Sequence, residues 1–237
     1  MQLLFVDESG DRKFREYFGL CVAAIHSAHY KTAKIGFHKV LREAAWDETV
    51  EFKGSHLFSA SKGDLKVAIE KRVEMAGQIL DLNKSDSNAR MRFHYFCHQD
   101  CKDQKTEYLA QLPMLVAKSL PQTAKKHGKD LVILSCDGRD DITATEIQKA
   151  VLPAIEDRGY TLVEEVTTPR SSFHTVGILY ADLVSYLSAR IDTIKSDVEL
   201  FEGIAPEVLE QNGKVKKLKS STDLIGRVKK LERHVIK

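Results

Sequence analysis

Residues 3–11 have the sequence LLFVDESGD, an apolar run that ends in a carboxylate and is followed by turn-forming residues. Such a run is typical of a buried central strand that ends in a tight turn. A second apolar run, YFGLCVAAI at residues 17–25, follows at the distance of a hairpin partner. The sequence therefore predicts an opening β-hairpin whose first strand is central in the sheet and carries Asp7 at its carboxyl end.

Strands and helices alternate along the rest of the chain. Apolar periodicity predicts helices at residues 30–46, 64–80, 108–127, 143–158 and 176–191, and strands at residues 91–97, 131–135 and 160–166. This order indicates an α/β fold, in which helices pack on a mixed β-sheet. A last amphipathic helix is expected within residues 224–235.

Composition limits the class of protein. The 237 residues suffice for one sizeable domain with an appendage. No apolar run approaches the roughly 20 residues that cross a bilayer. The N-terminus reaches a carboxylate at Asp7, which is unlike a signal peptide, so we expect a cytoplasmic protein.

The charge of the chain is unevenly distributed. Residues 214–237 carry nine Lys and Arg against two acids, which leaves a net charge of −5 on the rest. A basic segment attached to an acidic body suits a nucleic acid, with Lys216 and Lys217 as phosphate contacts. A solvated helix face explains the same charges equally well.

Four cysteines are present, and nothing indicates an oxidising compartment, so no disulfide framework is expected. Cys97 and Cys101 lie near His94 and His98, but the C-x-x-x-C spacing is loose and no second ligand pair follows at the usual distance. We therefore favour buried thiols at a strand end over a zinc site.

Two acids follow predicted central strands, Asp7 and Asp137. Open α/β sheets bind ligands at such strand ends, although either residue alone is more often a helix cap or a turn former. Asp182 lies in VGILYADLVSYL, where its helical neighbours are apolar. A buried ionised carboxylate costs several kcal/mol unless it is paired or binds a metal. Glu51 is a fourth acid, and Lys53 can share its side of an extended segment and contact a phosphate.

Together these segments resemble the DUF3800 family. The matching stretches are FVDESGD (5–11), EFKGS (51–55), LVILSCD (131–137) and YADLVSYLSAR (180–190). Each motif is short, but their order and spacing make the resemblance specific over residues 1–191. The family helix usually has Gln where this chain has Leu179, and the basic tail at 192–237 lies outside the similarity.

The resemblance implies a ribonuclease H-like domain at residues 1–191 and metal-dependent hydrolysis of phosphodiester bonds in DNA or RNA. Carried across by motif, the ligands of Mg²⁺ or Mn²⁺ are Asp7, Glu51, Asp137 and Asp182. Glu8 is a weaker candidate because adjacent strand residues point to opposite faces. Residues 192–237, outside the resemblance, are expected to form a basic extension with an amphipathic helix.

Further residues are candidates for contacts to substrate. Ser9 and Lys53 lie within the matching motifs, and His174 precedes the Asp182 helix, where it serves either as a proton carrier or as an ordinary loop histidine. Position alone adds Arg139 and Arg170 as phosphate candidates. Ser171 and Ser172 can help to hold a phosphate, but the same residues commonly cap helices.

Other functions fit less well. A haloacid-dehalogenase-type phosphatase needs a second Asp where this chain has Ser9, and a sugar-kinase-like protein needs glycine-rich phosphate loops. The main alternative is a non-catalytic module that binds nucleic acid or protein on the same fold. The residues leave open DNA, RNA or hybrid as substrate, endo- or exonucleolytic cutting, and whether the chain forms a homo-oligomer.

Overall fold

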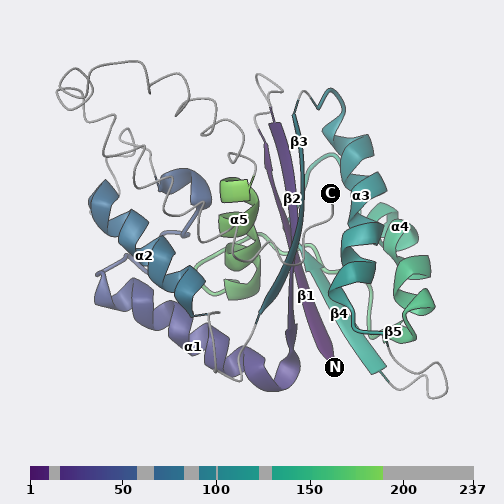
Figure 1. The fold of residues 1–237 in the computed structure, drawn as a ribbon, viewed down its shortest axis with the longest axis horizontal. Coiled ribbons are helices and arrows are strands. Elements are labelled where there is room, and N and C mark those ends of the chain that lie inside the picture. The colour runs from purple at the N-terminus through teal and green to yellow at the C-terminus, as the bar shows by residue number, and fades with distance from the viewer. Residues whose placement is uncertain (11–16, 58–66, 83–90, 100, 123–129, 189–237) are drawn as a thin grey trace.

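The computed structural model describes residues 1–10, 17–57, 67–82, 91–99, 101–122 and 130–188 (Figure 1). These residues form one five-stranded sheet with helices on both faces. The strands are β1 (Gln2–Gly10), β2 (Tyr17–His26), β3 (Arg92–Gln99), β4 (Asp130–Cys136) and β5 (Tyr160–Leu162). The helices are α1 (Ser27–Glu43), α2 (Ile69–Asp81), α3 (Gln104–Ser119), α4 (Ala144–Asp157) and α5 (Val176–Ser188), with a short 3-10 turn, η1 (Gly54–His56).

The strand order is β3-β2-β1-β4-β5. β2 pairs antiparallel with both β1 and β3, whereas β1 pairs parallel with β4, and β4 with β5. Only β2 therefore runs against the other strands of this sheet. This is the arrangement of the ribonuclease H-like fold, and the predicted α/β class with a mixed sheet and flanking helices is confirmed.

The central strand β1 is covered on both sides. Leu4 and Val6 face the core beneath α3 and α4, whereas Phe5 lies against the core formed with α1, α2 and α5. Successive strand residues alternate between faces, so Asp7 points toward the α5 side and Glu8 toward the α3 side. The same alternation decides which side chains can meet in the functional site.

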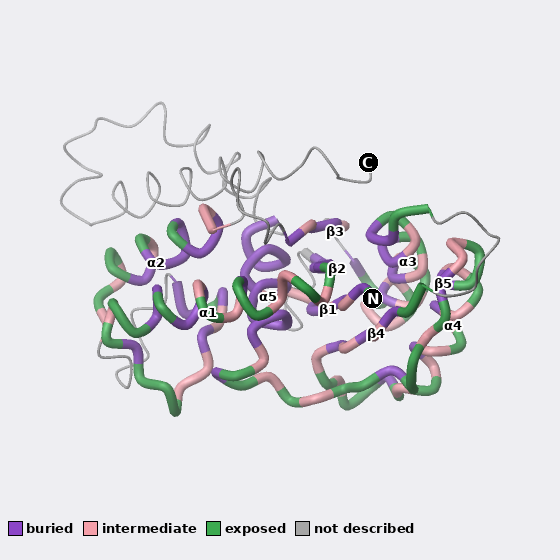
Figure 2. Tube along the Cα trace, turned by 90° about the horizontal axis from the view of Figure 1, so that it is seen from below, coloured by how far each residue is buried: buried purple, intermediate pink, exposed green. Residues whose placement is uncertain are grey.

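Helix α5 packs directly on the sheet. Every one of its residues is buried except Asp182, which is partly buried (Figure 2). The helix approaches β1 closely at Gly177, where any Cβ atom would overlap the ring of Phe5. This glycine therefore sets the distance between the helix and the strand that carry Asp182 and Asp7.

Several boundaries differ from the prediction. β1 continues past Asp7 to Gly10 because its antiparallel pairing with β2 persists after its parallel pairing with β4 has ended. β5 stops at Leu162 instead of residue 166, since the chain bulges outward at the exposed Glu164 and Glu165. Pairing with β4 then resumes at a single bridge, Ser135 to Thr167.

Three helices also begin elsewhere than predicted. α3 begins at Gln104 instead of residue 108, because Asp103 caps it there, and it ends at Ser119 instead of residue 127. α1 begins at Ser27, where the side chain of His26 accepts a hydrogen bond from the Ala28 N–H, and it ends before Ala45, whose φ of 55° is left-handed. α2 begins at Ile69, after the extended Ala68. The predicted helix at 224–235 and the whole basic extension lie outside the described residues. No helix in the described ranges is long and apolar enough to span a membrane.

We predict that Gly177→Ala lowers the free energy of unfolding by about 1–3 kcal/mol, because the added methyl group must displace the Phe5 ring. Gly36→Ala is the matched control: it also lies in a helix, but its new Cβ would meet only the flexible end of Leu82, at 3.3 Å. The control should be neutral or slightly stabilising, because Ala favours helix more than Gly does. Denaturant unfolding measures both, and equal effects would contradict the close-approach argument.

Candidate metal centre

Asp7 and Asp137 lie side by side at the end of the parallel β1–β4 pairing. The last parallel pair is Val6 with Cys136, and the Asp137 N–H then donates to the Val6 carbonyl at 2.8 Å. Asp7 is buried, at 6% exposure, and its Oδ1 accepts from the Glu8 N–H at 2.7 Å. Sheet pairing therefore places two carboxylates from distant parts of the chain next to each other.

Asp182 reaches the same region from α5. Its Oδ2 accepts the Gly54 N–H at 2.5 Å, and this contact anchors the segment at η1 to the helix. Gly54 is needed there because a Cβ would lie 2.5 Å from the Cβ of Tyr186. Glu51 and Lys53 come with this segment, and Lys53 Nζ lies 3.0 Å from Glu51 Oε2.

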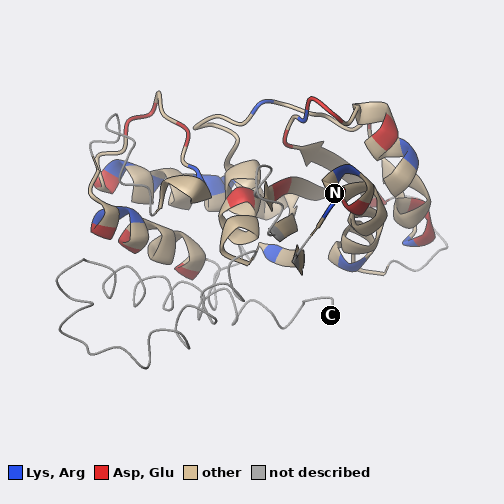
Figure 3. Cartoon of the chain, turned by 90° about the horizontal axis from the view of Figure 1, so that it is seen from above, with Lys and Arg blue, Asp and Glu red and all other residues tan. Residues whose placement is uncertain are grey.

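The carboxylates affect one another electrostatically. Burial raises the pKa of Asp7 well above its ordinary value, and the charges of Asp182, Glu8 and Asp137 raise it further. Burial likewise raises the pKa of Asp137, against the opposing effects of Ser171 and Lys53. Acidic segments of the sheet and of the helix packed on it lie close together in the middle of the molecule (Figure 3).

The pKa of Asp182 is also raised. Burial raises its pKa to about 7, although the Gly54 N–H and Lys53 both favour the ionised form. The charges of Glu51 and Asp137 add to the increase. Near neutral pH the group is therefore divided between its neutral and ionised forms, as expected of a carboxylate held among other carboxylates.

Lys53 supplies the positive charge. Burial alone would lower its pKa, but the hydrogen bond and charge of Glu51, together with Asp182 and Asp137, raise the pKa above its ordinary value. The ammonium group thus stays charged beside Glu51, Asp182 and Asp137. Asp137 has a second support, because its Oδ1 accepts the Ser171 N–H at 3.1 Å.

Glu8 and Arg139 belong to the other face of the sheet. Arg139 donates to Glu8 Oε1 at 2.9 Å and to both carboxylate oxygens of Asp141 at 2.8 Å, and it lies 5.3 Å from the ring centre of Tyr108. With its side chain only 3% exposed, this guanidinium is fully engaged within the protein. Arg139 is thus paired with acids of its own chain, and its contact with a phosphate stays a prediction. The side chain of Glu8 lies on the opposite face from Asp7, as predicted.

The remaining candidates are spread around the centre. Ser9 lies on the same face of β1 as Asp7, two residues further along, and Arg170 is exposed. The His174 ring contacts Phe173 and His38 at centroid distances of 5.3 and 6.0 Å. The Ser172 hydroxyl accepts the His174 N–H in the turn before α5. Lys216 and Lys217 lie outside the described residues.

The donor set suits a hard cation. Asp7, Glu51, Asp137 and Asp182 offer only carboxylate oxygens, which Mg²⁺ and Mn²⁺ prefer. Within the described part of the chain, however, no three of these acids have oxygens all within 4.8 Å of one another. Their oxygens instead accept from Gly54, Ser171, Glu8 and Lys53. A shared cation would therefore require the side chains to turn toward it.

Two backbone donors were missed by the sequence analysis. Gly54 and Ser171 hold Asp182 and Asp137 through their N–H groups, and no side-chain pattern identifies a backbone donor. The only signal for Gly54 was its place in the EFKGS motif.

Among known proteins, the chain was found to be similar to solved structures alone. No family model and no curated protein matches the sequence. The chain is similar to ribonuclease HII of Archaeoglobus fulgidus, solved in complex with PCNA, with 13% identity, a TM-score of 0.44, and coverage of 90% of this chain and 91% of that chain. It is also similar to ribonuclease H2 of Pyrococcus horikoshii OT3, with 12% identity, a TM-score of 0.44, and coverage of 97% and 100%. Function is therefore inferred from the site residues.

The raised pKa of Asp182 predicts how stability depends on pH. The folded-state pKa of about 7 exceeds the ordinary value of 3.8, so between these values the folded protein holds a proton that the unfolded chain has lost. In chelator, the free energy of unfolding should fall as the pH rises toward about 7 and then level off.

Asp182→Asn should remove the part of this fall that Asp182 causes, and should stabilise the protein at about pH 8 by roughly 1–4 kcal/mol, because one pKa unit corresponds to about 1.4 kcal/mol. The exposed Asp140→Asn is the control and should keep the wild-type profile. Denaturant titrations across pH measure the difference, and parallel profiles for Asp182→Asn and wild type would contradict a raised pKa.

Proposed function

We propose that this chain is a nuclease of the DUF3800 family, which hydrolyses phosphodiester bonds of DNA or RNA with Mg²⁺ or Mn²⁺. One observation carries the proposal: four carboxylates from four distant segments converge, with the pKa of Asp182 raised to about 7 and that of Asp7 raised by its neighbours. Such a cluster destabilises the fold when ionised, so a role beyond packing is needed to account for it.

Divalent cations would neutralise the negative charges of the carboxylates and so relieve the repulsion between them. Asp7, Asp137, Asp182 and Glu51 are the proposed ligands, on one face of the sheet and the turn beside it. Divalent cations held by these residues would supply the chemistry of a two-metal nuclease, which is the activation of a water and the stabilisation of the leaving oxygen.

The protein's own groups would orient the substrate. Lys53 keeps its proton because of the surrounding acids and can exchange Glu51 for a phosphate oxygen once Glu51 binds a cation. Ser9, on the same face as Asp7, can donate a hydrogen bond to the same phosphate. Lys216 and Lys217 would contact the nucleic-acid backbone further away.

Metal binding should be visible as stabilisation. Mg²⁺ in excess of its Kd should raise the Tm of the wild type, because the cation binds the folded state and relieves carboxylate repulsion. Asp7→Asn should reduce this shift strongly, whereas Glu165→Gln, which removes an exposed acid, should leave it unchanged. Thermal unfolding with and without Mg²⁺ tests this, and equal shifts for Asp7→Asn and wild type would remove the proposed site.

Catalysis is tested with labelled single-stranded, double-stranded and hybrid substrates in Mg²⁺ or Mn²⁺. Wild type should cut at least one class, and Asp182→Ala or Asp137→Ala should lower the rate by about 100-fold or more by removing a proposed ligand. Circular dichroism should show that both variants keep the fold. If wild type binds nucleic acid but cuts none, or if both variants cut at the wild-type rate, the proposed catalytic role is wrong.

A further inference from the structure

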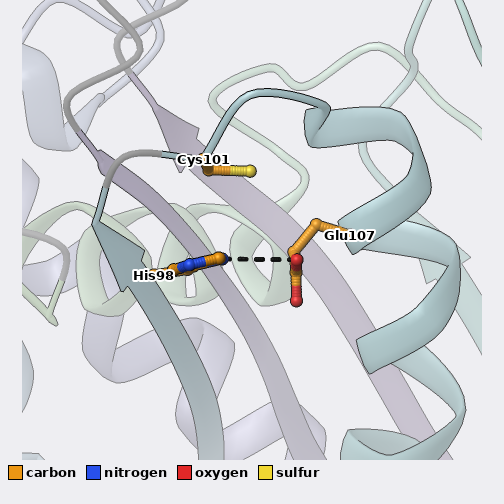
Figure 4. A group of neighbouring side chains, drawn as sticks. All are labelled: His98, Cys101 and Glu107. Atoms are coloured by element: carbon orange, nitrogen blue, oxygen red, sulfur yellow. Dashed lines mark hydrogen bonds and ion pairs between the residues drawn. The ribbon is translucent and has the colours of Figure 1, made fainter.

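A second group of potential ligands lies where β3 leads into α3. His98 is near the end of β3, Cys101 precedes the helix, and Glu107 lies in the first turn of α3 (Figure 4). One ligand atom from each residue lies within 4.8 Å of the other two. His98 Nδ1 and Glu107 Oε2 are 3.3 Å apart.

This group is separate from the carboxylate centre. His98 pairs with Phe18 of β2, whose side chain belongs to the core under α3 and α4, and Cys101 lies in that same core. Asp7 pairs with Cys21, whose side chain belongs to the core on the α5 side. The sheet therefore stands between the two groups, and they cannot share an ion.

Strand geometry also shows why the sequence did not reveal this group. Cys97 and His98 are adjacent in β3 and so point to opposite faces, which separates Cys97 from Cys101 despite the C-x-x-x-C spacing. His94 shares the face of His98 but lies four residues away, roughly 13 Å along the strand. The third group, Glu107, comes from the following helix, outside any cysteine–histidine pattern.

We propose that His98, Cys101 and Glu107 bind one transition-metal ion of the Zn²⁺ class, independently of the nuclease function. An imidazole, a thiolate and a carboxylate are the three kinds of ligand that zinc takes in proteins, whereas Mg²⁺ avoids sulfur. Three protein ligands leave the fourth tetrahedral position for water or an exchangeable ligand.

The exposure of the three side chains favours this assignment and makes the site accessible to an ion from solvent. Cys101 is 2% exposed, which keeps its sulfur from bulk solvent, whereas the side chains of His98 and Glu107 are 48% and 22% exposed. A cation can therefore enter past the imidazole and the carboxylate. Burial and the charge of Glu107 raise the pKa of Cys101, so binding releases the thiol proton to solvent as the metal–sulfur bond forms.

The bound ion would connect the edge strand to the next helix. The N-terminus of α3 is already capped by Asp103, whose carboxylate accepts the Thr106 N–H at 3.1 Å. A metal bridge from His98 to Glu107 would add a second link between β3 and α3. It would stabilise the folded state by binding only the assembled arrangement.

Co²⁺ titration of the full, metal-stripped chain tests the site, because cobalt occupies zinc sites and reports thiolate ligation by a near-ultraviolet sulfur-to-metal absorption band. Wild type should develop this band with one equivalent of Co²⁺, and Zn²⁺ should displace it. Cys101→Ser should abolish the band. Cys97→Ser is the matched control and should retain it, since Cys97 points to the other face.

His98→Gln and Glu107→Gln change partly exposed side chains and keep the buried thiol, so they test ligation without altering the core. Each should weaken Co²⁺ binding by roughly 10- to 100-fold or more. Asp7→Asn should leave the band unchanged, which separates this site from the carboxylate centre. The proposal is overturned if wild type shows no band, if the band persists in Cys101→Ser, or if it disappears in Cys97→Ser alone.

Discussion

The close contact between α5 and β1 brings carboxylates together in a partly water-excluded space, and the rest of the site depends on it. Gly177 lets the helix approach Phe5, so Asp182 comes near enough to Asp7 for its charge to raise the pKa of Asp7. The N–H groups of Gly54 and Ser171 and the ammonium of Lys53 partly offset that repulsion. The segments around residues 51–54 and 171 are held at the sheet by these contacts.

The sheet also separates two kinds of chemistry. On the α5 face the proposed ligands are all carboxylates, whose oxygens suit hard cations. On the α3 face an imidazole, a thiol and a carboxylate gather at the end of β3. The alternation of side chains along β1, β2 and β3 keeps these groups on opposite sides, although both lie toward the same ends of the strands.

On the α3 face, the charge of Arg139 is neutralised by acids of the same chain. Arg139 joins Glu8 to Asp141 beneath Tyr108, so a residue that looks like a phosphate ligand in the sequence instead joins the loop after β4 to β1. His174 similarly packs on aromatic neighbours. A charged or titratable residue near a predicted site is therefore weak evidence for a contact with substrate, because short-range partners from other segments decide its role.

The sequence by itself determined the order of strands and helices, the mixed sheet, and the acids that follow central strands, because apolar periodicity and strand alternation are local properties. It also singled out Asp182, since a carboxylate within an apolar helix is visible in the sequence alone. Only the tertiary structure decided which donors hold each acid, how far β1 extends, and that Glu107 joins His98 and Cys101. Those features depend on contacts between segments far apart in the chain or on backbone N–H groups, which every residue except proline carries and which leave no pattern in the sequence.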